Sequence, residues 1–134
     1  MTIATSFAES LAKPAVLFSI LCALAPAAPA YAATAGAMRQ EVAHLLDSVA
    51  ASHCQFNRNG SWYEAAEARD HLRKKFDYLD QRHQVATAEN FIERAATSSS
   101  ISGKSYLIRC PGAAPVESAA WLGAELARYR KQAR

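Results

Sequence analysis

One stretch joins the two kinds of secondary structure expected in this chain: Cys54-Gln55-Phe56-Asn57-Arg58-Asn59-Gly60-Ser61-Trp62-Tyr63. Apolar and polar residues alternate over residues 54–57, which predicts a short strand. The dipeptide Asn59-Gly60 favours a tight turn directly after it. Ser61 and Glu64 then have the spacing of a capping box, so a helix is predicted to begin near residue 61.

Helical periodicity dominates the chain on both sides of this stretch. Residues 38–52 and 61–81 each carry an apolar stripe, and Thr87 is suited to cap a third helix over residues 88–97. A fourth helix is expected over residues 116–131. The predicted buried stripes are Met38, Val42, Leu45, Leu46 and Val49; Ala65, Ala68, Leu72, Phe76 and Leu79; Phe91, Ile92 and Ala95; and Ala119, Leu122, Leu126 and Tyr129.

A second strand is expected late in the chain. Residues 97–104 form a polar, serine-rich loop, and residues 105–110 then alternate around Tyr106 and Ile108. Paired with residues 54–57, this strand would complete a two-stranded β-ribbon. The predicted fold is therefore mainly α: a small bundle of about four helices with a short, disulfide-linked ribbon, in a single domain of residues 33–134.

The N-terminal segment predicts export. Lys13 precedes an apolar run over residues 14–24, and Ala30-Tyr31-Ala32 supplies small residues in an A-x-A arrangement. These are the parts of a cleaved secretory signal peptide, residues 1–32. Cleavage is predicted after Ala32, with Ala30 as the alternative. The run is shorter than the roughly 20 residues that cross a bilayer. The cleaved protein is thus expected to be periplasmic and not to span a membrane.

The cysteines fit the same compartment. Of the three present, Cys22 lies in the predicted signal peptide, which leaves Cys54 and Cys110. An even number of cysteines in an oxidising compartment favours a disulfide bond, worth roughly 4 kcal/mol for a loop of this length. A metal site of His53, Cys54 and Cys110 is the alternative, but no C-x-x-C pair supports it. No metal or cofactor is predicted.

The charge pattern excludes one class of partner. The formal net charge is only +3, and acidic and basic residues are mixed along the chain. Nucleic-acid binding usually requires a clustered basic face, so no nucleic-acid partner is expected.

Five blocks of residues carry a resemblance: Phe56-x-Arg58-Asn59-Gly60, Ala68-x-x-His71-Leu72-x-x-Lys75, Thr87-Ala88-Glu89-x-Phe91-Ile92, Ser98-Ser99-Ser100-x-Ser102-Gly103-Lys104-x-Tyr106 and Pro111-Gly112. In order and spacing they resemble the YfeK-like family of small exported bacterial proteins, a family of unknown function. The resemblance covers about residues 56–112 and implies a periplasmic, mostly helical protein. It implies no activity, cofactor or catalytic residue.

Catalysis is the less favoured interpretation of the polar residues in these blocks. His71 could act as a general base on Ser99 or Ser100, which would make the protein a small envelope hydrolase using the loop of residues 98–102. No orienting acid and no oxyanion-hole signature accompany this pair. Gly103-Lys104-Ser105 also lacks the earlier glycine, and the strand–loop–helix order, of a phosphate-binding loop.

A non-catalytic role is favoured instead. Arg58 and Asn59 lie at the expected hairpin tip, where exposed side chains are often functional. The favoured function is that of an exported binding or accessory protein, which contacts an envelope protein or an anionic ligand through the hairpin tip and the serine-rich loop. The residues predicted to bind are Arg58, Asn59, Lys75, Ser102 and Lys104.

Overall fold

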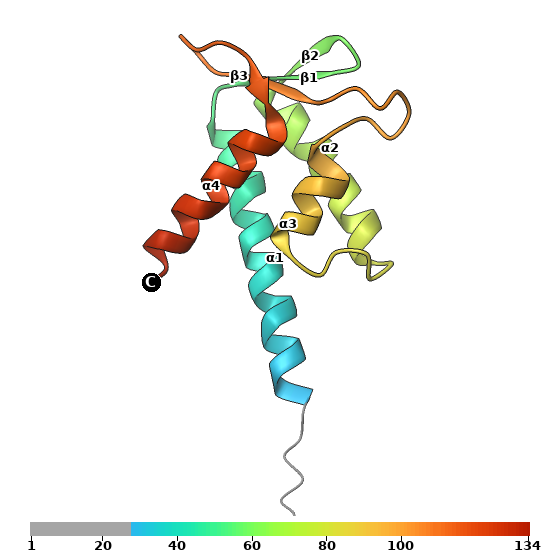
Figure 1. Ribbon diagram of the computed structural model, residues 1–134, viewed down its shortest axis with the longest axis vertical. Coiled ribbons are helices and arrows are strands. Elements are labelled where there is room, and N and C mark those ends of the chain that lie inside the picture. Colours follow the sequence, from blue (N-terminus) through green and yellow to red (C-terminus); the bar gives the residue numbers. More distant parts are fainter. Residues whose placement is uncertain (1–27) are drawn as a thin grey trace, which may run out of the picture.

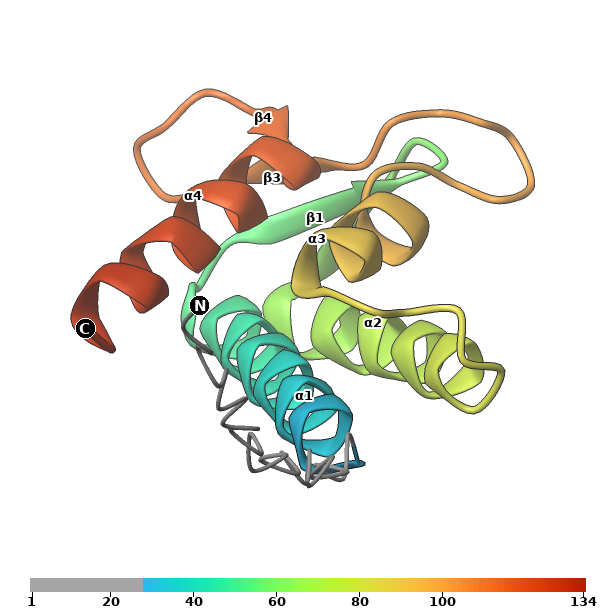
Figure 2. The same ribbon diagram turned by 60° about the horizontal axis from the view of Figure 1, so that its bottom comes forward.

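The computed structural model describes residues 28–134, and its helices pack against one side of a small sheet (Figures 1 and 2). The elements are α1 (Ala28–Ala51), β1 (Gln55–Arg58), β2 (Ser61–Glu64), α2 (Ala65–Asp80), α3 (Ala88–Phe91), the π-helical turn η1 (Ile92–Ala96), β3 (Leu107–Arg109), β4 (Val116–Glu117) and α4 (Ser118–Gln132). Most of the predicted signal peptide lies outside the described residues, so export stays a prediction.

The sheet differs from the predicted ribbon. Over the described residues it has four strands in the order β2-β1-β3-β4, and each neighbouring pair is antiparallel. The predictions that helices begin at residues 61 and 116 are wrong, because the residues at those two positions form β2 and β4. The mainly helical character of the fold is confirmed.

The turn after β1 explains why β2 forms in place of a first helical turn. Asn59 and Gly60 have φ angles of 53° and 88°, the left-handed conformations that a two-residue hairpin turn requires. The turn sends the chain back along β1 and places Tyr63 opposite Phe56. Aromatic residues fit such a half-buried strand well. The helix begins only after Glu64, which forms no side-chain cap, so the predicted capping box does not form.

The disulfide prediction is confirmed. Cys54 immediately precedes β1, Cys110 immediately follows β3, and the two cysteines are bonded. The pairing of Gln55 with Arg109 brings these two strand ends together.

Most of the predicted stripes meet in one core. Leu79, Ala119 and Tyr129 are only partly buried, whereas the other predicted positions are buried. Thr87 caps α3 as predicted, by accepting the N–H of Asn90. The largest apolar side chains with no exposed surface come from α1, α3, β3 and α4: Val42, Leu45, Val49, Phe91, Ile108 and Leu122.

One ion cluster ties three helices together. Arg130 of α4 donates to both carboxylate oxygens of Glu41 on α1, at 2.7 and 2.9 Å. It also donates to Glu89 at the start of α3. Its hydrogen bond lowers the pKa of Glu89 below the ordinary value. The cluster therefore favours the charged forms of Glu89 and Arg130.

Replacing Arg130 with glutamine is expected to lower the free energy of unfolding by about 1 kcal/mol, because the pairs are only partly buried. Because the pKa of Glu89 is lowered in the folded protein, the charged carboxylate stabilises the fold above its ordinary pKa of 4.5. This stabilisation is lost as the pH falls through the lowered pKa. The difference between Arg130→Gln and wild type should thus shrink in acid. Urea unfolding at pH 7 and pH 4 measures both effects. Lys131→Gln, an exposed neighbour, is the matched control; an equal loss in that variant would contradict the cluster.

Candidate functional site

Several predicted site residues meet around one open cleft of about 410 Å³. They come from the β1–β2 hairpin, from α2 and from the serine-rich loop, which are far apart in the sequence. The predicted residues that line the cleft are Arg58, Asn59, His71, Lys75, Ser99 and Ser100, and the additional ones are Tyr63, Ile101 and Tyr106.

The two remaining predicted binding residues lie outside this cleft. Ser102 holds the loop against the hairpin, because its hydroxyl donates to Oδ1 of Asn59. Lys104 is exposed and lines neither this cleft nor the adjoining one described below. The hairpin and the loop are thus connected through Asn59, at the hairpin tip that the sequence predicts to be functional.

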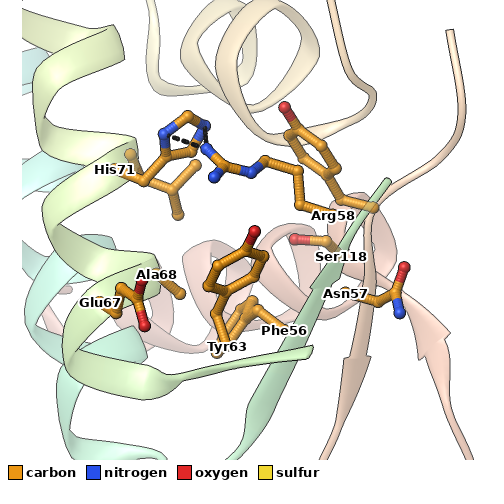
Figure 3. A pocket seen from close by; sticks show the side chains of 10 residues that line it. Phe56, Asn57, Arg58, Tyr63, Glu67, Ala68, His71 and Ser118 are labelled. Carbon is orange, nitrogen blue, oxygen red and sulfur yellow. Dashed lines mark hydrogen bonds between the residues drawn. The ribbon is translucent and has the colours of Figure 1, made fainter. Parts of the chain in front are cut away.

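Arg58 is directed at His71. Figure 3 shows its side chain reaching from β1 to the imidazole on α2, with Nη1 2.7 Å from Nδ1 and 3.1 Å from Nε2. Arginine carries only N–H donors, so the ring nitrogen that accepts must be deprotonated. Burial lowers the pKa of His71 below its ordinary value, and the charge of Arg58 lowers it further. The geometry and the electrostatics both favour a neutral imidazole.

Lys75 is a second cation in the same place. It is partly buried, and burial lowers its pKa, as does the charge of Arg58. Its ammonium group lies 3.4 Å from the hydroxyl of Tyr106 and 5.2 Å from the centre of that ring. Burial raises the pKa of Tyr106, so this tyrosine stays a neutral hydrogen-bonding group.

Carboxylates are absent from the lining. No Asp or Glu lines the open cleft, and over the described residues neither Arg58 nor Lys75 forms an ion pair. Glu67 lines a small hollow of about 40 Å³ that Arg58 and His71 also line, but it forms an ion pair with neither Arg58 nor Lys75. Among the described residues, the site therefore holds two positive charges without a counterion.

A second basic cleft adjoins the first. It has a volume of about 330 Å³ and shares His71, Lys75 and Ser100 with the larger one. Lys74 of α2 and Arg94 of η1 add two further cations, and no acidic residue lines this part either. Together the two clefts form a continuous basic surface, which we call the basic cleft: Arg58, Lys74, Lys75 and Arg94, with His71 and Ser100 between them.

Sequence reasoning missed the two tyrosines of the site. Tyr63 was predicted to lie in a helix, yet it occupies β2 beneath the guanidinium of Arg58, 4.8 Å from the ring centre. The signal that could have found it is the Asn-Gly turn, whose register places Tyr63 on the same sheet face as Phe56 and Arg58.

The geometry does not support the hydrolase alternative. No serine hydroxyl bonds to His71 in the described chain, and Arg58 occupies the lone pair that a general base would use. Ser99 is buried, and its hydroxyl accepts the N–H groups of Ile101 and Ser102. Ser99 therefore stabilises the turn of the loop and forms no hydrogen bond to His71.

A serine–histidine contact does occur elsewhere, between Ser48 and His44, but it lacks catalytic geometry. Ser48 and Glu125 both approach the same nitrogen, Nε2 of His44, at 3.3 and 2.8 Å. In a catalytic triad the acid must bind the opposite ring nitrogen from the nucleophile. The imidazole stacks on Tyr129, so this group serves to join α1 to α4.

The described residues also bear on a metal site and on membrane-spanning helices. The metal alternative fails because the disulfide removes both thiolates of Cys54 and Cys110, and no cluster of metal-ligating side chains occurs in the part of the chain that the structure describes. In the same part, none of the helices combines the length and apolar character needed to cross a bilayer.

Comparison with known proteins places this chain in a family of unknown function. The chain is 47% identical over 51 residues to the uncharacterized protein YfeK of Salmonella typhimurium, an alignment that spans 38% of this chain and 41% of that relative. No solved structure matches it. The model of a family of unknown function, DUF5329, matches residues 36–130. That match covers well over half of the chain and confirms the predicted resemblance: the chain belongs to the DUF5329 family.

Proposed function

We propose that this chain is an exported, non-catalytic binding protein that takes up an anionic group of its ligand in the basic cleft. One observation carries the proposal: Arg58 and Lys75 are partly buried and line the same cleft, and no described residue that lines it is a carboxylate. Partly buried charges are ordinarily paired. An anion in the cleft would supply the missing partner and would accept charge-assisted hydrogen bonds from both cations.

The surrounding groups favour binding over reaction. Arg58 presents a planar fork of donors suited to carboxylate, sulfate or phosphate. Tyr63 and Tyr106 line the same cleft, where their hydroxyl groups can donate to an anion. In the described chain, His71 bonds to Arg58 and to no serine hydroxyl. Export is supported by the N-terminal apolar run and its A-x-A end, and by a disulfide that suits an oxidising compartment.

Replacing Arg58 with glutamine is expected to weaken sulfate binding at least about tenfold, because one charge-assisted donor pair is lost. Lys75→Gln should weaken it several-fold and should also stabilise the free protein slightly, by about 0.5 kcal/mol, since it removes repulsion between like charges. Sulfate titrations followed by amide NMR shifts measure the affinity and locate the site.

Lys131→Gln is the control for net charge, because Lys131 is exposed at the end of α4, away from the cleft. Sulfate that fails to shift the amides around Arg58, His71 and Lys75 in wild type would refute the proposal. Equal affinities for Lys131→Gln and Arg58→Gln would refute it as well, because the effect would then be one of overall charge.

A further inference from the structure

We propose that the face carrying the basic cleft docks on the surface of an anionic lipid bilayer, where Ile101 enters the interface and the cleft binds a lipid phosphate group. The inference rests on the proposed anion binding and adds the source of the anion. It is carried by one exposed apolar side chain, by its position beside the cations, and by the absence of Asp and Glu from the described residues that line the basic cleft.

Ile101 is exposed to solvent on a turn that is held by hydrogen bonds among its own residues. Its side chain is 94% exposed, although isoleucine is among the residues most often buried. The buried hydroxyl of Ser99 accepts the N–H groups of Ile101 and Ser102, and the Ser99 backbone bonds to Gly103 and Lys104. These hydrogen bonds hold the turn in a conformation that leaves Ile101 exposed, so its exposure is a property of an ordered turn.

The exposed apolar residue and the cations lie together. Ile101 itself lines the larger part of the basic cleft with Arg58 and Lys75, and its neighbour Ser100 lines both parts. Tyr78, which is 56% exposed, lines the smaller part. Tyrosine is favoured where an apolar layer meets water. Basic residues around one or two apolar side chains are the composition of a surface that binds an anionic bilayer.

The shape of the molecule makes this face accessible. In Figures 1 and 2 the loop between η1 and β3 extends beyond the helices, on the same side as the β1–β2 turn. The hydrogen bond from Ser102 to Asn59 joins the two. A flat partner could therefore reach both tips and the cleft between them at once.

Charge complementarity selects a bilayer as the occupant. Arg58, Lys74, Lys75 and Arg94 face the cleft, and no carboxylate lines it. A protein partner would ordinarily require a larger apolar centre than one isoleucine and one tyrosine supply. An anionic bilayer requires only attraction from the cations and a shallow apolar contact.

The test is co-sedimentation with vesicles, using protein recovered from cells that express the full chain. Wild type is expected to bind vesicles of phosphatidylglycerol and phosphatidylcholine at least about tenfold more tightly than vesicles of phosphatidylcholine alone, and added salt should weaken the binding. Ile101→Thr should weaken it roughly tenfold, and Arg94→Gln about fivefold. Val116→Thr and Lys131→Gln are the matched controls, since Val116 is an exposed apolar residue on β4.

The outcomes separate this inference from the proposed function. Sulfate binding in the cleft without vesicle binding would overturn the docking surface and leave a free anion or an acidic protein as the occupant. Vesicle binding that Ile101→Thr and Arg94→Gln leave unchanged would overturn it too. If neither sulfate nor vesicles bind, both proposals fail. Unchanged thermal unfolding of Ile101→Thr, expected for so exposed a residue, shows that its loss of binding is not a loss of fold.

Discussion

Reduction of the disulfide between Cys54 and Cys110 is expected to lower the free energy of unfolding by about 4 kcal/mol, the largest stability effect of any single change considered for this chain. The bond closes a loop with a sequence separation of 56 residues, which contains the β1–β2 hairpin, α2, α3, η1 and β3. Opening this loop gives the unfolded chain many more conformations. Because one kcal/mol moves the melting temperature of a domain of this size by roughly 4–8 °C, the melting temperature should fall by at least about 15 °C.

Thermal unfolding followed by circular dichroism, with and without reductant, measures this effect. The variant Cys54→Ala/Cys110→Ala should melt at the lower temperature in both conditions, apart from a small loss of packing at Cys54, which is buried. Because this variant has no disulfide, an unchanged melting temperature would show that the reductant destabilises wild type only by breaking the bond. Wild type that melts at one temperature in both conditions would show that the bridge contributes nothing to stability.

The helices were predictable because each buries a stripe that repeats with the helical period. Val42, Leu45 and Val49 in α1 have no exposed surface, and no local signal in that segment opposes the pattern. Residues 61–64 carry two conflicting signals. The spacing of Ser61 and Glu64 favours a cap, whereas the preceding Asn-Gly turn directs the chain back along β1, and the tertiary pairing of Tyr63 with Phe56 prevails.

Only part of the candidate site was predictable: Arg58, Asn59 and Lys75 were predicted to bind and do line the cleft, whereas its tyrosines and the contacts among its residues were not predicted. Arg58 and Lys75 are separated by the whole of β2 and most of α2, so only the fold brings them together. The sequence suggests that His71 could act as a general base, whereas in the structure its ring accepts a hydrogen bond from Arg58. The exposure of Ile101 depends on hydrogen bonds within the turn, which have no periodic signature.

Anion binding in the basic cleft is expected to strengthen as the pH falls from 8 toward 5, with His71 as the titrating group. In the free protein the pKa of His71 lies below its ordinary value of 6.5, so the imidazole is neutral at pH 7. A bound anion would favour the protonated ring and raise that pKa by roughly one to two units. Binding then takes up a proton, and linkage requires the affinity to rise at lower pH.

The expected rise is roughly ten- to a hundredfold in total and at most about tenfold per pH unit, which is the limit for uptake of one proton. Affinity should level off above the pKa of the bound state and again below that of the free state. Sulfate is the suitable probe, because its own charge is constant over this range. The charged and titratable groups lining the same cavities as His71 are Arg58, Tyr63, Glu67, Lys74, Lys75, Tyr78, Arg94 and Tyr106.

Substituting His71 with glutamine is expected to flatten this pH profile at an affinity close to that of wild type at pH 8, because the neutral amide resembles the deprotonated ring in charge. His83→Gln is the matched control: His83 is exposed and lies outside both parts of the cleft, so its removal should leave the profile intact. A profile that stays steep in His71→Gln would place the titration elsewhere. A flat profile in wild type would mean that the anion lies too far from the imidazole to share the site formed by Arg58 and Lys75.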